Sequence, residues 1–80
     1  LKTTGRTYCF DKSATNYKTI GLFKDPNDYR SFYRIKDEGS GIPIIILDKK
    51  QNIYKEIFCK VKIQDNGYEG WIKEKLIDYN

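Results

Sequence analysis

In the stretch Asp65-Asn66-Gly67-Tyr68-Glu69-Gly70-Trp71-Ile72, two glycines flank two other residues. The only tryptophan of the chain directly follows the second glycine. Asn66-Gly67 is a strong hairpin signal, because glycine adopts a positive φ without steric cost. Gly70 lies inside the returning strand, where glycine is unfavourable unless another part of the chain approaches the backbone closely. The stretch therefore predicts a tight hairpin, a close contact at Gly70, and a Trp71 ring that covers one end of the core.

Other short apolar runs, each bounded by turn-forming residues, predict an all-β chain of antiparallel strands. Turns are expected at residues 25–28 and 48–52, and Gly21 is expected to weaken or bulge its strand. A frayed lead-in is expected over residues 1–5. The expected strands cover residues 6–10, 17–24, 29–36, 42–47, 53–64 and 68–73, and a single helical turn is expected at residues 74–77.

Two strands need a closer reading. Residues 29–36 (YRSFYRIK) could form a helix that Asp25 caps and Pro26 begins, but residues with high β-propensity dominate and favour a strand. In the strand at residues 53–64, apolar residues at 57, 59, 61 and 63 alternate with Phe58, Lys60 and Lys62. This period of two is typical of a half-buried antiparallel strand, with Cys59 facing inward.

Length and composition indicate one small globular domain. The chain has 80 residues, of which 39% are hydrophobic and 32% charged, and its net charge is +4. No apolar run reaches the ~20 residues that a membrane-spanning helix needs. The chain begins at Leu1 and contains no methionine, so we expect it to be a piece of a larger or processed protein.

The closing segment NGYEGWIKEKLI, residues 66–77, resembles the end of bacterial SH3-like domains, in which a hairpin, a Gly-Trp-aliphatic triplet and a helical turn complete a barrel. Three other segments are similar to further parts of that family. IFCKVKI at 57–63 resembles its aromatic-x-Lys-Val strand, YCFDKSATNYKTIGLF at 8–23 its first strand-loop-strand unit, and GSGIPIIILDKK at 39–50 its middle strand. The resemblance implies a small SH3-like barrel of five to six short antiparallel strands with a terminal helical turn.

The residue inventory argues against catalysis. The chain has no histidine, which removes histidine general bases, Cys–His nucleophiles and most zinc sites. Neither Gly39-Ser40-Gly41 nor the pair Gly67 and Gly70 fits a phosphate-binding loop, because no helix with the required Lys and Ser or Thr follows. We therefore expect neither an enzyme nor a bound metal or cofactor. Cys9 and Cys59 form an even pair, so a disulfide in an exported domain and two free thiols both stay open.

Aromatic residues are the remaining functional signal, at 15% of the chain. The aromatic residues expected in the thin core are Tyr8, Phe10, Phe23, Phe58 and Trp71. The tyrosines that lie beside expected loops or turns are Tyr17, Tyr29, Tyr33, Tyr54 and Tyr68. Tyrosine suits a binding surface because its large rigid ring costs little entropy to fix. We therefore predict a shallow ligand groove, with ordinary surface tyrosines as the alternative. The predicted groove consists of Tyr17, Tyr29, Tyr33 and Trp71, with Lys18 and Arg34 at its edge.

The resemblance implies a non-catalytic module that targets a bacterial envelope protein, secreted, periplasmic or on the cell surface, to peptidoglycan or its peptides. A module that docks a peptide of a partner protein is the alternative. A small barrel that binds nucleic acid ranks last, because no cluster of lysines and aromatic residues shares one predicted face.

Overall fold

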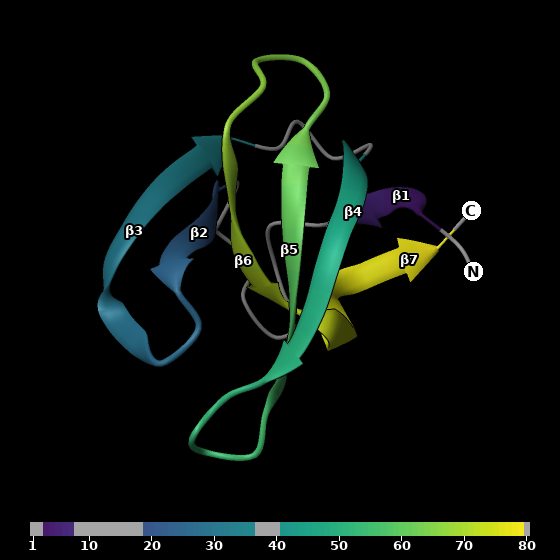
Figure 1. The fold of residues 1–80 in the computed structure, drawn as a ribbon. Coiled ribbons are helices and arrows are strands. Elements are labelled where there is room, and N and C mark those ends of the chain that lie inside the picture. The colour runs from purple at the N-terminus through teal and green to yellow at the C-terminus, as the bar shows by residue number, and fades with distance from the viewer. Residues whose placement is uncertain (1–2, 8–18, 37–40, 80) are drawn as a thin grey trace.

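The structure is a computed structural model that describes residues 3–7, 19–36 and 41–79, with side chains described except at residues 19–20, 29 and 31–36. Its regular structure is β-strand apart from one short 3-10 turn (Figure 1). The elements are β1 (Thr4–Thr7), β2 (Thr19–Asp25), β3 (Asp28–Lys36), β4 (Ile42–Gln51), β5 (Ile57–Ile63), β6 (Glu69–Lys73), η1 (Glu74–Leu76) and β7 (Ile77–Tyr79).

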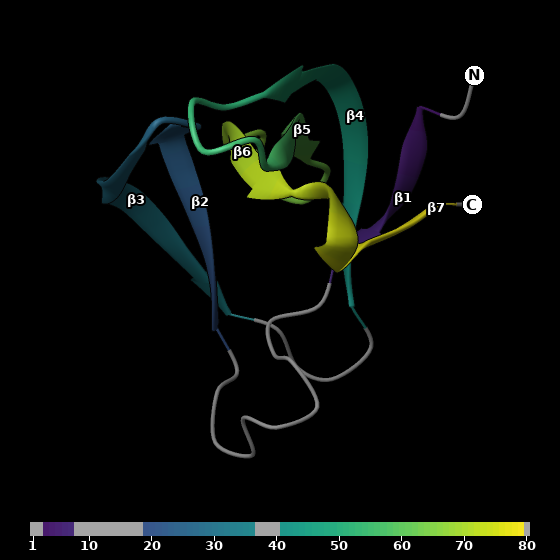
Figure 2. The same cartoon turned by 90° about the horizontal axis from the view of Figure 1, so that it is seen from below.

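The strands form one antiparallel sheet in the order β3-β2-β6-β5-β4-β1-β7. The strands β4, β5 and β6 follow one another as hairpins, whereas β2 joins β6 through the paired positions Phe23 and Trp71. The sheet curls, so that β2 and β3 stand on one side of β5 and β6, and β4 and β1 on the other (Figure 2). The all-β class is therefore confirmed. The edge strands β3 and β7 are not paired with each other in the described part of the chain, so the sheet is not closed.

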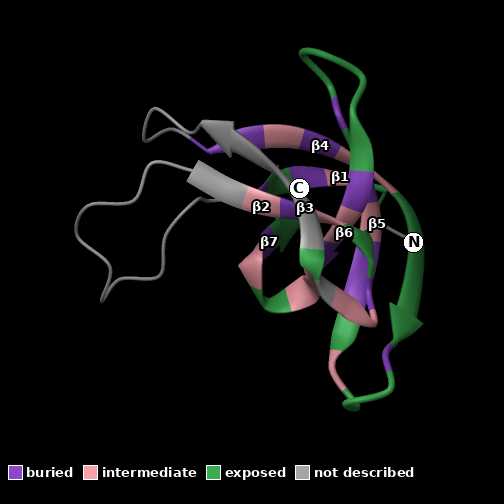
Figure 3. Ribbon diagram, turned by 90° about the vertical axis from the view of Figure 1, so that its left-hand side faces the viewer, coloured by how far each residue is buried: buried purple, intermediate pink, exposed green. Residues whose placement is uncertain are grey.

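The main core is built from cross-strand partners on one face of the sheet. Ile44 lies opposite Ile63 in β4 and β5, and Cys59 lies opposite Ile72 in β5 and β6. Directly opposite residues share a face, so the alternation in β5 turns Cys59 inward as predicted. Buried positions recur along β4 and β5 (Figure 3). The core cluster consists of Leu22, Ile42, Ile44, Cys59, Val61, Ile63, Ile72 and Ile77.

Both glycines of the opening stretch have the predicted roles. Gly67 has a φ of 76°, and its N–H donates to the carbonyl oxygen of Ile63 at 2.8 Å, which closes the β5–β6 hairpin. At Gly70 a Cβ would lie 2.6 Å from Cγ of Leu22 and 3.0 Å from the carbonyl oxygen of Phe23. Leu22 is fully buried. The missing side chain at Gly70 therefore lets β2 pack directly on β6.

A second apolar cluster, made of aromatic side chains, lies on the face of the sheet opposite the main core. Phe58 has Lys50 and Lys73 as cross-strand partners, yet it is fully buried. Its ring packs edge-on against Phe23, with the ring centroids 6.0 Å apart and the planes at 68°. Trp71, the Cα partner of Phe23, shares this face and is half-buried, and the ammonium of Lys50 lies 5.7 Å from its ring centroid. The sheet thus has apolar contacts on both faces.

Several predicted boundaries were wrong. β4 continues to Gln51, so residues 48–51 of the turn expected at residues 48–52 are strand, and the connection to β5 covers residues 52–56. Gly21 keeps its register opposite Arg34, and the irregularity falls between Phe23 and Asp25 instead. The lead-in is not frayed throughout, because Gly5 pairs with Tyr79 and a Cβ there would collide with the carbonyl oxygen of Asp78.

Three other predictions are confirmed. The segment 29–36 is a strand and not a helix, because it lies in β3 and pairs antiparallel with β2. The turn between these strands falls at Pro26 and Asn27, inside the predicted range. The helical turn after β6 is η1, from which β7 returns to pair with β1.

Candidate functional site at a junction of two loops

Asn52 organises the loop between β4 and β5. Its side chain is buried, and its Nδ2 donates to the carbonyl oxygen of Pro26 at 2.9 Å. Its Oδ1 accepts from the backbone N–H of Tyr54 at 3.0 Å and of Glu56 at 2.8 Å. A buried side chain with three such bonds fixes the shape of its loop, because each bond satisfies a group that would otherwise lose its contact with water.

A second bond ties the same two loops together. The backbone N–H of Ile53 donates to Oδ1 of Asn27 at 2.8 Å, and the backbone N–H of Asn27 donates to Oδ1 of Asp25 at 2.9 Å. The bonds from Asn52 and Ile53 each join positions 26 residues apart in the chain. We call the region formed by residues 25–28, Arg30 and residues 52–56 the loop junction.

A shallow pocket of about 470 Å³ lies at the loop junction, lined by Asp25, Asn27, Asp28, Arg30 and Tyr54. Oδ1 of Asp28 accepts from the Nε of Arg30 at 3.1 Å and from its backbone N–H at 2.9 Å. These bonds from Arg30 lower the pKa of Asp28, and the same contact raises the pKa of Arg30. Asp25 has a backbone amide as its partner and no cation within the described residues. The pocket thus combines an aromatic ring, an ion pair and a carboxylate that is not engaged by a cation.

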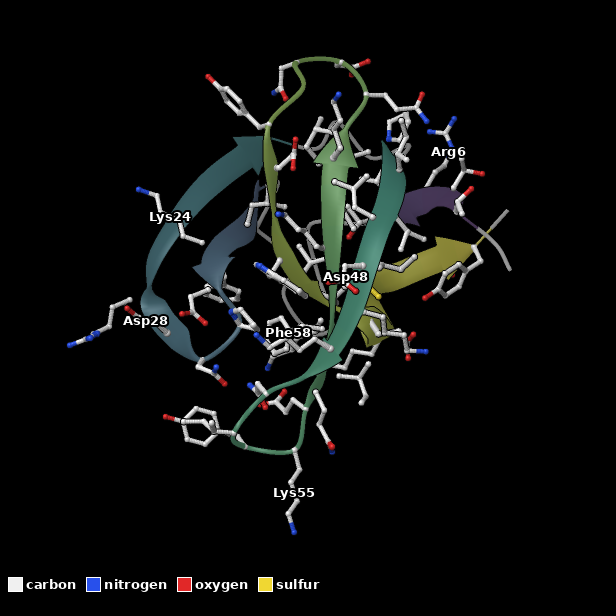
Figure 4. All side chains as sticks on the ribbon, viewed as in Figure 1. Arg6, Lys24, Asp28, Asp48, Lys55 and Phe58 are labelled. Carbon is white, nitrogen blue, oxygen red and sulfur yellow. The ribbon has the colours of Figure 1, made fainter. Side chains whose placement is uncertain are left out.

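The loop junction also carries the most exposed large apolar side chains of the described residues. Ile53 is 70% exposed and Tyr54 is 60% exposed. The neighbouring Lys55 has a φ of 65° and points away from the body of the protein (Figure 4). Exposed apolar groups on a well-fixed loop are typical of binding surfaces, because little conformational entropy is lost on binding.

A polar cluster around Glu74 lies elsewhere, beside η1 and β7. Oε2 of Glu74 lies 2.6 Å from the ammonium of Lys49 and accepts from the hydroxyl of Tyr79 at 2.9 Å. The thiol of Cys59 approaches the same oxygen at 3.9 Å and the Tyr79 hydroxyl at 3.7 Å. Lys49 and then Tyr79 lower the pKa of Glu74, whereas burial raises the pKa of the Cys59 thiol. The protonated thiol is therefore a poor nucleophile.

Cys59 is a free and buried thiol, in line with the second of the two readings of the cysteine pair. Cys9 lies outside the described residues.

The predicted groove is only partly within the described residues. Tyr17 and Lys18 lie outside them, and Tyr29, Tyr33 and Arg34 lie on β3 at positions where the backbone alone is described. Tyr33 is the partner of Leu22, and β2 separates β3 from β6, which holds Trp71. The backbones of Tyr33 and Trp71 are therefore two strand spacings apart, about 10 Å. The groove stays a prediction.

The loop junction was not predicted from the sequence. Asn52 was assigned to the end of a turn, and its main partner, Pro26, lies far away in the chain. The turn at Pro26 and Asn27 was predicted, but its contact with a second loop has no local signal. Among the residues of the loop junction, only Tyr54 had a functional signal in the sequence, as a tyrosine beside an expected turn.

Within residues 3–7, 19–36 and 41–79, no group of three or more cysteine or acidic side chains is placed to hold a metal ion. No helix in that part of the chain is long and apolar enough to cross a membrane. Comparison of the chain with protein-family models, with curated proteins and with solved structures finds no match.

Proposed function

We propose that this chain is a non-catalytic binding module of the bacterial SH3-like type, and that it binds a peptide of cell-wall peptidoglycan at the loop junction. The order of elements supports the SH3-like part of this proposal. The β5–β6 hairpin, the Gly70-Trp71-Ile72 triplet and η1 follow one another as the resemblance implies.

The observation that carries the binding role is the fixed exposure of Tyr54 beside the pocket. The hydrogen bonds of Asn52 hold the loop in place, so Tyr54 can contact a ligand without the entropy cost of ordering a mobile segment. A tyrosine ring offers both an apolar face and a hydroxyl, which suits an extended peptide.

The charges of the pocket indicate which part of a peptide would bind there. Arg30 is engaged by Asp28, whereas Asp25 has no cationic partner among the described residues. A ligand amine placed between the Asp25 carboxylate and the Tyr54 ring would gain an ion pair and a cation–π contact. We therefore favour a peptide that carries a free amine, with the apolar part of its chain on Tyr54.

Co-sedimentation with purified peptidoglycan sacculi tests the proposal. Tyr54→Ala keeps the backbone N–H that bonds to Asn52, so it should fold and yet bind about tenfold more weakly, as the loss of an aromatic contact predicts. Tyr68→Ala is the matched control, because Tyr68 is 55% exposed on the separate β5–β6 loop. Acetylation of the free amines of the sacculi should also reduce binding.

Three results separate the parts of this proposal. If the unmodified protein stays in the supernatant at moderate salt, the peptidoglycan ligand is wrong, and peptides of partner proteins become the ligands to screen. If Tyr54→Ala and Tyr68→Ala bind equally well, the loop junction is not the site. If acetylated sacculi bind as well as untreated sacculi, the role of Asp25 is wrong while the site itself stands.

A further inference from the structure

The end of the β4–β5 loop, formed by Ile53, Tyr54 and Lys55, is called the loop tip here. Ile53 and Tyr54 have exposed fractions of 70% and 60%, above those of every other large apolar side chain in the described part of the chain. Single exposed apolar residues are ordinary on protein surfaces. Two adjacent ones with the highest exposures among the described large apolar side chains indicate a binding surface.

The loop tip is fixed before it meets any partner. The N–H of Lys55 donates to the carbonyl oxygen of Asn52 at 3.1 Å, and the carbonyl oxygen of Lys55 accepts from Nε2 of Gln51 at 3.2 Å. Asn52 is itself buried and tied to Pro26. Ile53 and Tyr54 are therefore held at the surface by the fold, and their exposure is not the result of a loosely packed loop.

The shape of the loop tip indicates what kind of partner it fits. The β4–β5 loop projects beyond the sheet at the end opposite the β5–β6 loop (Figure 1). Lys55 points outward from it (Figure 4). A stable protein interface buries about 800 Å² on each partner, which is more than two side chains on a convex tip supply. A lipid headgroup layer needs no matching pocket, and tyrosine is enriched at that depth because its ring is apolar and its hydroxyl polar.

The charges around the loop tip favour an anionic surface. Lys50 and Lys55 are exposed and form no ion pair with the described residues, whereas the carboxylate of Glu56 is engaged by Lys73 at 3.1 Å. Asp28 in the adjacent turn is neutralised by Arg30, which leaves Asp25 as the one nearby carboxylate without a cation. The chain as a whole carries a net charge of +4, which adds long-range attraction to anionic lipids.

We propose that the loop tip inserts Ile53 and Tyr54 into the headgroup region of an anionic lipid bilayer, with Lys55 at the lipid phosphates. This contact shares Tyr54 with the proposed peptide site and extends beyond it to Ile53, which does not line the pocket of the loop junction. It is weak by itself. A single myristoyl chain gives a partition constant of about 10⁴ M⁻¹, so two inserted side chains should give about 10³ M⁻¹ or less. The loop tip would orient the domain at a membrane surface to which something else attaches it.

Co-sedimentation of the whole chain with vesicles tests this proposal. One set of vesicles contains phosphatidylcholine alone, and the other contains equal parts of phosphatidylcholine and phosphatidylglycerol. Ile53→Ser keeps the backbone N–H that bonds to Asn27 and should weaken binding to the anionic vesicles by about tenfold, as the loss of a buried aliphatic side chain predicts. Lys55→Asn should weaken it by about fivefold, and asparagine tolerates the left-handed φ of this position.

The control is Tyr68→Ser, which removes an exposed apolar side chain from the separate β5–β6 loop and should leave vesicle binding unchanged. The proposal is overturned if the protein does not bind anionic vesicles at millimolar lipid, or if Ile53→Ser binds them as well as the unmodified protein. Equal losses for Ile53→Ser and Tyr68→Ser would also overturn it. The loss of sacculus binding by Tyr54→Ala and by acetylation of the sacculi does not depend on lipid, so a failure of vesicle binding is distinguishable from a failure of the peptide site.

Discussion

Replacement of Gly70 by alanine tests why a glycine precedes the tryptophan. The new Cβ would lie 2.6 Å from Cγ and 2.9 Å from Cδ2 of Leu22, well inside ordinary contact distance. Leu22 is fully buried and cannot move outward without disturbing the core. Overpacking of this kind costs about 1–3 kcal/mol. Alanine in place of glycine recovers about 0.5–1 kcal/mol of backbone entropy in a strand, so the expected net loss is about 1 kcal/mol.

Urea unfolding followed by circular dichroism measures this loss. A destabilisation of about 1 kcal/mol should also lower the melting temperature of a domain of this size by roughly 6 °C. Leu22→Ala removes the atoms with which the new Cβ collides, so the loss for the double variant should be smaller than the sum of the single losses by about 1 kcal/mol or more. Gly67 is the contrasting position, because its constraint is a φ of 76° with no near atom closer than Cε of Lys62 at 3.9 Å.

Asparagine tolerates a left-handed φ, so Gly67→Asn should cost well under the roughly 1–2 kcal/mol expected of Gly67→Ala. Gly70→Asn should instead be as harmful as Gly70→Ala, or more so. The reasoning is refuted if Gly70→Ala is neutral or stabilising, or if its effect adds to that of Leu22→Ala within about 0.5 kcal/mol.

Three further predictions concern the polar side chains. Asn52→Ala should lower the unfolding free energy by about 2–3 kcal/mol, because three hydrogen bonds of about 1 kcal/mol each are lost, and a neutral effect in urea unfolding would contradict the role given to this residue. Lys49 and Tyr79 lower the pKa of Glu74, so the stability that Glu74 contributes is present above the ordinary carboxylate pKa and is lost as the pH falls through the lower pKa of the folded state. Glu74→Gln should therefore destabilise the domain at neutral pH and not in strong acid. An equal loss of stability at both pH values would contradict this role of Glu74. In a Cys9→Ser variant, burial of the Cys59 thiol and its raised pKa should make labelling by a thiol reagent as slow as unfolding, whereas rapid labelling of the native protein would show that the thiol is accessible.

The parts of the fold that the sequence predicts are those with local causes. The hairpin at Gly67 depends on the φ of one residue. The alternation in β5 follows from the period of two of its own backbone, which pairs with β4 and β6 on either side. The end of β4 was mispredicted because residues 48–51 are polar and resemble a turn. They are strand because the β4–β5 hairpin extends past the core, where the residues are exposed to water.

The candidate site was not predictable for a different reason. Alternation places Phe58 on the face opposite Cys59, and its burial was predicted, but its packing partner Phe23 from β2 was not. The loop junction likewise depends on the bond from Asn52 to Pro26, and no window of neighbouring residues contains both. Contacts between distant segments decide which residues a ligand could reach, and these contacts are set by the curl of the sheet.

The pairing of β1 with β7 has a consequence for how the domain can be joined to other chains. Gly5 is the partner of Tyr79, so the first and last described strands, β1 and β7, run side by side at one edge of the sheet (Figure 1). A short linker could connect the end of β7 to the start of β1, which makes circular permutation feasible with new termini in the β5–β6 loop. For the same reason the domain could be inserted into a surface turn of a host protein without forcing apart the two strands of the host that flank it.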